Sequence, residues 1–196
     1  MKKGQRSAKK HLSVRNAEKT KELLLKAAAD LFSKNIFEHV STREISKKAG
    51  VDAALINRYF GSKKKLFMTV LDSYIPYFRV KSTADSVRSN LYIYLKEFLN
   101  FDLPSIQVSI VRFFYYAGFS PSMGGDFAKV YEREIVFPLV EAFGENGLLK
   151  ARLALAYISG VIIFFRFDAS QKGSKEETDC ILKQYETLLE NLDKMC

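Results

Sequence analysis

The fold is decided by the stretch Ser41-Thr42-Arg43-Glu44-Ile45-Ser46-Lys47-Lys48-Ala49-Gly50-Val51-Asp52-Ala53-Ala54-Leu55-Ile56-Asn57-Arg58-Tyr59-Phe60-Gly61-Ser62. Ser41 and Glu44 have the spacing of a capping box, which starts a helix. Gly50 ends that helix, because glycine adopts a positive φ at little cost. Asp52 then caps a second short helix, Ala53–Phe60. Two short helices on either side of Gly50-Val51-Asp52 are typical of a helix-turn-helix.

The second of these helices has two different faces. At 100° per residue, Ile56 and Phe60 lie on one face, which we expect to be buried. The opposite face carries Ala54, Leu55, Asn57 and Arg58. An arginine pairs well with guanine, an asparagine with adenine, and apolar groups meet the thymine methyl, so this face suits the major groove of DNA.

Charge is concentrated in the first third of the chain. Residues 1–65 contain 17 lysines and arginines against 6 acidic residues, whereas residues 66–196 contain 14 against 16. Residues 1–16 carry six basic residues and no acid, and we expect them to form a flexible basic arm. Clustered cations indicate a surface for a polyanion, although a basic end that only improves solubility would give the same count.

Helical periodicity continues on both sides of the motif. A helix around Leu23–Phe32 is expected to end at Asn35, which tolerates a left-handed conformation. Ser62 is placed to cap a helix from Lys63 to about Phe78, and further helices are expected near 85–100, 105–116, 123–143, 148–167 and 174–194. The predicted class is all-α, with about nine helices. We expect an arm (1–16), a three-helix helix-turn-helix domain (17–65) and a larger helical domain for effector binding and dimerisation (66–196).

Several classes of function have no support in the sequence. The two cysteines and two histidines lack metal-ligand spacing, and no catalytic triad, phosphate loop or cofactor motif is found, so we expect neither an enzyme nor a metal or cofactor site. The longest apolar run, 153–165, is shorter than the roughly 20 residues that span a bilayer. We therefore expect a cytoplasmic protein with a buried helix there and no membrane association.

The stretch from Thr20 to Leu71 resembles the DNA-binding domain of the TetR family of repressors. The residues that carry the resemblance are Ala27–Phe32, Ser41–Ile45, Ala49–Asp52 and, most specifically, Ile56–Phe67. The resemblance implies a homodimer that binds double-stranded DNA at a palindromic operator. It also implies phosphate contacts at Ser41, Tyr59 and Lys63. The full set of predicted DNA-contacting residues adds the outward face and its neighbours: Thr42, Arg43, Ala53, Ala54, Leu55, Asn57 and Arg58.

Most of the aromatic residues lie after residue 65, in the expected effector domain. A cavity for a small hydrophobic or aromatic effector would be lined by Tyr74, Phe78, Phe98, Phe101, Arg112, Phe113, Tyr116, Phe127 and Tyr131. Ligand pockets are mainly apolar with few polar groups, which fits this set. The same rings could instead fill the core, and Arg112 could form a surface ion pair.

The resemblance also implies that the last two helices form the dimer interface. The apolar residues expected there are Leu155, Ile158, Ile162, Ile181, Tyr185, Leu188, Leu189 and Leu192. Such a stripe could equally face the core of its own chain. The function predicted from the sequence is a ligand-responsive, sequence-specific transcriptional repressor. The alternative is an architectural or partner-binding DNA protein of the same fold without a small effector.

Overall fold

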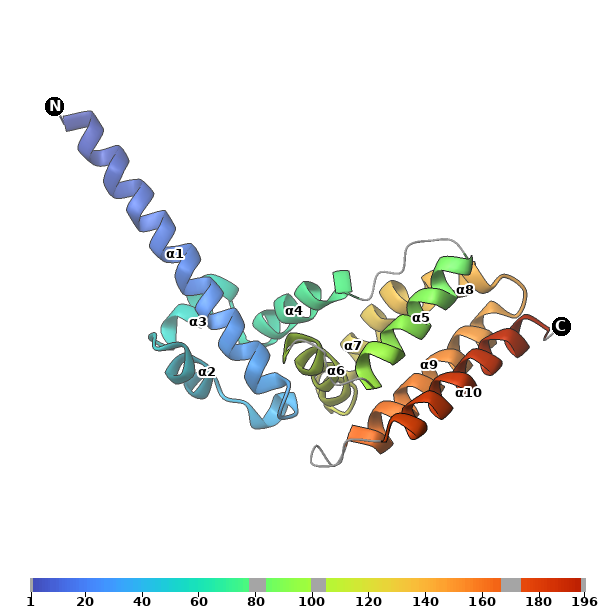
Figure 1. The fold of residues 1–196 in the computed structure, drawn as a ribbon. Coiled ribbons are helices and arrows are strands. Elements are labelled where there is room, and N and C mark those ends of the chain that lie inside the picture. The colour runs from blue at the N-terminus through green and yellow to red at the C-terminus, as the bar shows by residue number, and fades with distance from the viewer. Residues whose placement is uncertain (1, 78–83, 100–104, 167–173, 195–196) are drawn as a thin grey trace. The chain divides into compact units, whose positions relative to one another are not determined.

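The computed structural model describes residues 2–77, 84–99, 105–166 and 174–194, and all its regular structure in these ranges is helical. Figure 1 shows the elements in chain order. The helices are α1 (Lys2–Phe32), α2 (Thr42–Ala49), α3 (Ala54–Phe60), α4 (Lys63–Tyr74), α5 (Ala84–Leu99), α6 (Ser105–Gly118), α7 (Gly124–Tyr131), α8 (Phe137–Phe143), α9 (Gly147–Arg166) and α10 (Lys175–Asp193). A π-helical segment, Glu132–Val136, joins α7 to α8 without a break. Counted with that join, the described ranges hold nine helices, which confirms the predicted all-α class.

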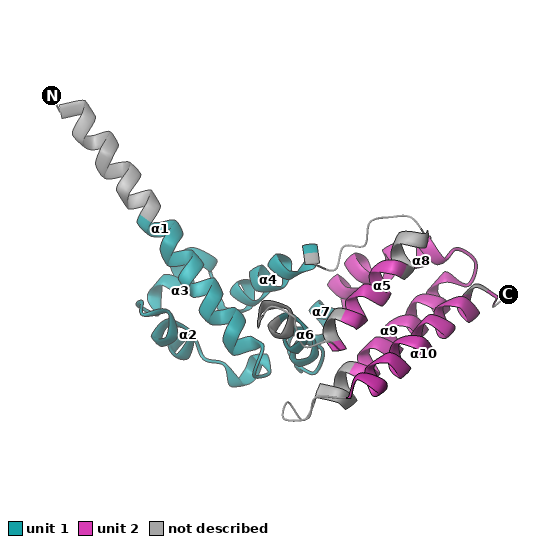
Figure 2. Ribbon diagram, viewed as in Figure 1, with its two compact units in different colours: residues 1–76, 109–127 teal, residues 77–108, 128–196 magenta. Residues whose placement is uncertain are grey.

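The chain divides into two compact units, shown in Figure 2. Unit 1 comprises residues 1–76 and 109–127, and unit 2 comprises residues 77–108 and 128–196. Unit 1 therefore holds α1 to α4 together with most of α6 and the start of α7. This division differs from the expected boundary after residue 65, because α4 and α6 supply part of the apolar core of the first unit.

Helix α1 packs on α2 and α4 through small and apolar residues. Leu24, Ala28 and Phe32 have at most 1% of their surface exposed and recur at helical spacing. The helix begins at Lys2, so its backbone includes the stretch that we expected to form a flexible arm. Its end also differs from the prediction. The backbone of Asn35 does not adopt the left-handed conformation. Its side-chain amide instead donates to the carbonyl of Leu31 at 3.1 Å.

Helix α2 starts and stops where the sequence predicted, whereas α3 begins one residue later than expected, at Ala54, with Ala53 in the N-cap position. Ser41 and Glu44 form the capping box, and Gly50 ends α2 with a φ of 68°. The carboxylate of Asp52 accepts a hydrogen bond from the backbone N–H of Ala54 at 2.7 Å, which supports the first turn of α3. Gly61 ends α3 with a φ of 80°. These positions need glycine because other residues rarely adopt a positive φ.

An aromatic cluster joins α1, α4 and α6 within unit 1. The ring of Phe113 on α6 stacks on Phe67 of α4 at 4.8 Å between centroids and meets Tyr74 edge-on at 5.3 Å. Phe32 of α1 packs edge-on against Phe67 at 5.1 Å. Helix α4 ends at Tyr74, before a 3-10 turn that contains Pro76, and so does not continue to Phe78 as expected. Proline lacks the N–H that an α-helix needs, which accounts for the early end.

Unit 2 is built around four helices. Helix α5 packs on α8 and α10, and α9 packs on the same two helices. The core that they share includes Leu95, Leu139, Ala154 and Tyr185. The hydroxyl of Tyr157 on α9 donates to the carbonyl of Ile181 on α10 at 3.1 Å, which fixes the register of these two helices. Among the described residues, every helix is too short or too polar to cross a membrane.

Candidate nucleic-acid interface

Helix α3 presents the outward face that the sequence predicted. Ile56 is fully buried and holds the helix against the rest of unit 1. Ala54, Asn57 and Arg58 are exposed, and Leu55 is half-buried. A short helix anchored by one buried residue, with an amide and a guanidinium free on the other side, has the geometry that base reading in the major groove requires.

Helix α2 precedes α3 in the motif, and hydrogen bonds of its capping box hold the polar groups at its start. The backbone N–H of Ser41 donates to Glu44 at 2.7 Å, and the Ser41 hydroxyl donates to the same carboxylate at 2.7 Å. These bonds hold the pKa of Glu44 below its usual value. The hydroxyl proton of Ser41 is therefore already used. Arg43 is exposed and Thr42 is half-buried, so at this helix start the guanidinium is the group best placed to meet a phosphate.

Lys63, expected to contact a phosphate, forms two hydrogen bonds within the protein. Its ammonium donates to the carbonyl of Phe37 at 2.9 Å and to that of Val40 at 2.8 Å. It also lies 3.9 Å from the centre of the Phe37 ring. Partial burial lowers the pKa of Lys63, and the nearby carboxylates of Glu38 and Glu44 offset part of that effect. An ammonium has three donors, so one donor of Lys63 remains for DNA.

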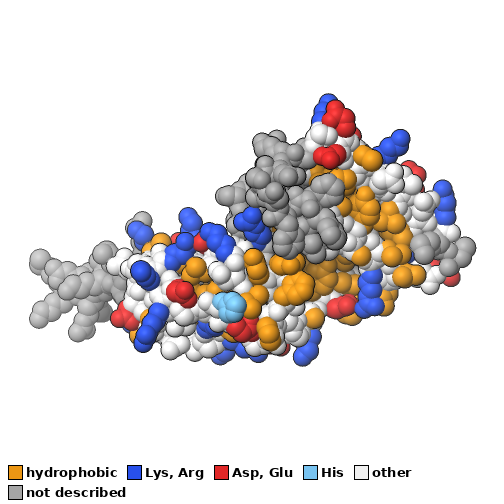
Figure 3. All heavy atoms as spheres, turned by 90° about the horizontal axis from the view of Figure 1, so that it is seen from below, with side chains coloured by type: hydrophobic (Ala, Val, Ile, Leu, Met, Phe, Trp, Pro, Cys, Tyr) orange, Lys and Arg blue, Asp and Glu red, His pale blue; other side chains and the backbone are white. Residues whose placement is uncertain are grey.

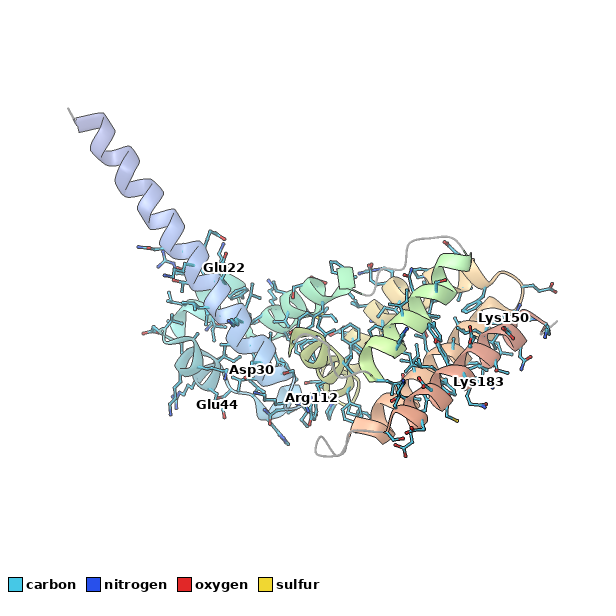
Figure 4. The ribbon with its side chains drawn as sticks, viewed as in Figure 1. Glu22, Asp30, Glu44, Arg112, Lys150 and Lys183 are labelled. Carbon is cyan, nitrogen blue, oxygen red and sulfur yellow. The ribbon has the colours of Figure 1, made fainter. Side chains whose placement is uncertain are left out.

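The other basic side chains of the motif differ in how firmly they are held. Lys48 of α2 reaches Asp30 of α1 at 2.9 Å, and Lys34 reaches the same carboxylate at 2.8 Å. Hydrogen bonds from these two lysines lower the pKa of Asp30, which lies between α1 and α2 in Figure 4. Lys47 and Lys65 are exposed. Figure 3 shows lysine and arginine side chains spread over the surface that α1 to α4 form.

Tyr59 is half-buried and lies among cations. Lys21 of α1 and Arg58 of α3 are each 5.9 Å from the centre of its ring. At that distance each cation is weakly attracted to the ring face. The ring of Tyr59 therefore helps to hold Arg58 at the edge of the outward face. Ala53, also expected at the interface, precedes α3 and is half-buried.

The residues expected to line an effector cavity fall into different parts of the molecule. Tyr74 and Phe113 are buried in the aromatic cluster of unit 1, where they serve as core. Phe127 is 9% exposed and packs edge-on against Phe114 at 5.3 Å. Tyr116 is half-buried in unit 1, and Arg112 is exposed on α6, as Figure 4 shows.

Tyr131 is the one described member of that set in unit 2. It is half-buried, and burial raises the pKa of its hydroxyl to about 12, with the Glu132 carboxylate adding to the shift. It lies directly before the π-helical segment, a type of distortion that often occurs at functional sites. Phe78 and Phe101 lie outside the described residues, and so does the side chain of Phe98.

Four of the residues expected at a dimer interface are instead in the core of unit 2: Ile158, Tyr185, Leu189 and Leu192. Leu155, Ile181 and Leu188 lie at the edge of that core and are half-buried. The side chain of Ile162 lies outside the described residues. Ile158 and Leu189 keep 4% of their surface exposed, and Tyr185 and Leu192 keep none, so a second chain would contact α9 and α10 mainly through the residues around them.

A different apolar stripe of α9 is exposed. Leu149 is 51% exposed, Leu153 is 37% exposed, and Ala156 is exposed as well. Their spacing places them on the side of α9 opposite Ala154 and Ile158, which face the core. Figure 3 shows apolar side chains at the surface of this part of the chain. Periodicity in the sequence does not reveal this stripe, because α9 is apolar on nearly every side and its two faces look alike.

Two groups of contacts in unit 1 were also missed. The carboxylate of Glu38 accepts hydrogen bonds from Ser120 and Ser122, and Lys64 pairs with Asp126 at 2.5 Å. The first joins the 3-10 turn between α1 and α2 to the turn between α6 and α7, and the second joins α4 to α7. In the sequence the serines flank Pro121 and indicate only a turn, and no local pattern relates residue 38 to residue 120.

Comparison with known proteins agrees with this geometry. Residues 24–70 match the family described as bacterial regulatory proteins, tetR family. The transcriptional repressor NicS of Pseudomonas putida is 43% identical over 56 residues, which cover 29% of this chain and 26% of that protein. The chain thus spans about a quarter of the length of this curated relative.

Solved structures extend the likeness in fold to nearly the whole chain. NalD, the secondary repressor of the MexAB-OprM multidrug efflux pump in Pseudomonas aeruginosa, superposes with a TM-score of 0.66 at 18% identity, covering 92% of this chain and 96% of that one. AibR, solved in complex with isovaleryl coenzyme A and operator DNA, has a TM-score of 0.63 at 13% identity, covering 87% and 97%. At these identities the comparison shows the fold alone.

The described residues form an all-helical fold with an N-terminal helix-turn-helix whose second helix exposes Asn57 and Arg58, which defines the helix-turn-helix class of folds. The chain resembles the tetR family of bacterial regulatory proteins in the sequence of residues 24–70, and it resembles the solved regulators in fold over most of its length.

Proposed function

We propose that the protein is a transcriptional repressor that reads a specific DNA sequence through α3. The observation that carries this proposal is the contrast within one short helix, where Ile56 is completely buried while Asn57 and Arg58 are exposed. A buried anchor with polar side chains on the opposite side fixes the distance between the helix and a groove. The likeness of this region to the repressor NicS supports the same role.

The proposed form on DNA is a homodimer that binds an inverted repeat. The exposed apolar stripe Leu149, Leu153 and Ala156 of α9 supplies a surface that a second copy would bury. Leu155, Ile181 and Leu188, at the edge of the core, would border it. A two-fold symmetric dimer places two recognition helices about 34–36 Å apart, which matches successive turns of the major groove.

The proposed regulation is by a small hydrophobic or aromatic effector. The neighbour AibR was solved with both isovaleryl coenzyme A and operator DNA, which supports a fold that accommodates the two kinds of ligand. Tyr131, half-buried beside the π-helical segment, is the described candidate in unit 2. Tyr74 and Phe113 stay in the proposed effector set, since a side chain buried against other rings of unit 1 can also line a cavity.

Selection of DNA from a random library tests the proposed function. Purified protein is incubated with random duplexes at a fixed salt concentration near 150 mM, and the bound DNA is sequenced after several rounds. The salt must be fixed because phosphate contacts make affinity depend strongly on it. We expect enrichment of one inverted repeat. Binding without enrichment of any sequence would favour an architectural DNA protein, and the absence of binding would contradict both.

A further inference from the structure

The 3-10 turn Phe37–His39, between α1 and α2, is held from two sides within unit 1. On one side lies the turn between α6 and α7. The Glu38 carboxylate accepts hydrogen bonds from the Ser120 hydroxyl at 2.9 and 3.1 Å, from the backbone N–H of Ser122 at 2.9 Å, and from the Ser122 hydroxyl. One carboxylate therefore accepts hydrogen bonds from both serines of that turn.

Ser120 connects this contact to the start of α7. It is 3% exposed, and its oxygen accepts a hydrogen bond from the backbone N–H of Met123 at 3.0 Å while its hydroxyl donates to Glu38. A second tie, the ion pair between Lys64 of α4 and Asp126 of α7, joins the same two regions. The turn between α6 and α7 cannot shift without disturbing Glu38.

On its other side the 3-10 turn is held by Lys63. The two carbonyls that receive its ammonium, those of Phe37 and Val40, stand before and after Glu38 and His39 in the chain. Val40 is 2% exposed, and Ser41 follows it directly as the N-cap of α2. Lys63 is itself the first residue of α4. One short segment thus links the turn at residues 120–122 to the starts of α2 and α4.

We propose that the segment Phe37–Val40 is a coupling joint, in which Glu38 is a positioning residue that transmits the position of the α6–α7 turn to the DNA-contacting starts of α2 and α4. This inference rests on the proposed function. Helices α6 and α7 both continue into unit 2, so their shared turn is a point through which events in that unit reach the helix-turn-helix. By thermodynamic linkage the coupling acts in both directions, so DNA binding must also stabilise the turn.

The electrostatics of the joint support a specific contact. Partial desolvation alone would raise the pKa of Glu38, but the hydrogen bonds from Ser122 and Ser120 outweigh it and lower the pKa to about 2. The carboxylate is thus fully ionised at neutral pH. The ammonium of Lys63 adds a favourable charge on the other side. Three donors of the protein thus converge on one carboxylate, and hydrogen bonds to an ionised acceptor are stronger than those between neutral groups.

The test is a double-mutant cycle with DNA affinity as its measurement. The variants are Glu38→Ala, Ser122→Ala and the double substitution, each titrated with the duplex that the wild-type protein selects. Ser73→Ala is the matched control, since Ser73 is in unit 1 and its hydroxyl donates only to its own helix, at Val70. In parallel, amide hydrogen exchange is measured at Ser122 and Met123 with and without the duplex, because their N–H groups report the joint directly.

We expect each single substitution to weaken DNA binding by about 2- to 30-fold and the double substitution to weaken it no further. In the wild-type protein, DNA should slow exchange at Ser122 and Met123, and Glu38→Ala should abolish that slowing. Ser73→Ala should behave as wild type. If Glu38→Ala does not fold, Ser122→Ala and the wild-type exchange data still decide the matter.

Two results would overturn the inference while leaving the proposed function intact. One is a wild-type protein that binds its selected duplex without any change in exchange at Ser122 and Met123. The other is a Ser122→Ala variant with the affinity of Ser73→Ala. A wild-type protein that selects no duplex would instead contradict the proposed function itself.

Discussion

The rings of Phe67 on α4 and Phe113 on α6 stack with their centroids 4.8 Å apart and their planes inclined by 29°. Both side chains have at most 1% of their surface exposed. This pair ties a helix of the helix-turn-helix region to a helix more than forty residues later in the chain. The DNA-binding part is therefore stabilised by residues that the sequence alone assigned to another domain.

Replacing Phe113 with alanine should destabilise unit 1. The substitution leaves a cavity beside Phe32, Phe67 and Tyr74, and removal of a buried phenylalanine costs about 3–5 kcal/mol. Urea denaturation followed by circular dichroism measures the loss. The control is Phe119→Ala, since that ring is 65% exposed and its removal should cost far less. Equal stability of the two variants would show that the aromatic cluster is not a core.

Lys63 should matter for folding as well as for DNA. Lys63→Met keeps much of the side-chain length but removes the donors to Phe37 and Val40. The Val40 carbonyl loses this partner, whereas the Phe37 carbonyl keeps the backbone N–H of Val40 at 3.3 Å. Loss of a partner to buried polar groups costs about 1–3 kcal/mol, so the melting temperature should fall even without DNA. Lys65→Met is the control, because Lys65 is exposed. A Lys63→Met protein with wild-type stability would mean that Lys63 serves DNA alone.

Acid should weaken the contact between Glu38 and the two serines. The pKa of Glu38 is about 2 in the folded protein against an ordinary value of 4.5. A lowered pKa contributes stability that is fully present above about pH 4.5 and is lost as the pH falls through 2. The melting temperatures of wild type and Glu38→Ala should therefore differ at pH 6 and converge towards pH 2.5. A difference that stays constant over this range would contradict the contact.

The dimer should depend on the exposed stripe of α9. Leu149→Glu together with Leu153→Glu places charges on a surface that a second copy would bury, so sedimentation equilibrium should show monomers that remain helical. Ile93→Glu is the control, because Ile93 is also exposed, at 48%, but belongs to α5. A folded double variant that still sediments as a dimer would place the interface elsewhere.

The sequence predicted the helix-turn-helix well because its signals are local. Ser41 with Glu44, Gly50 and Asp52 each act on backbone groups a few residues away, and each was found in its expected role. The outward face of α3 followed from periodicity alone, since Ile56 is the buried residue that it required.

The assignments that the sequence left open have a common physical cause. Residues of the type of Tyr185 and Leu189 suit both a protein core and a dimer interface. Only the packing of α9 on α10 shows that these two lie in the core. A buried ring such as that of Phe113 likewise suits both the wall of a cavity and a packed core. The contact of Glu38 with Ser120 joins residues far apart in the chain, and nothing in either local sequence indicates it.

The measurement that tests the account most directly is the effect of Arg58→Ala on binding to every single-base variant of the selected operator. Arg58 is exposed on α3, so its removal should cost about 1–3 kcal/mol and relax the preference at one base position in each half-site. Lys47→Ala, which removes an exposed charge from α2, should weaken binding evenly across all variants. If Arg58→Ala also weakens binding evenly, with no position losing its preference, then α3 does not read the operator through this face.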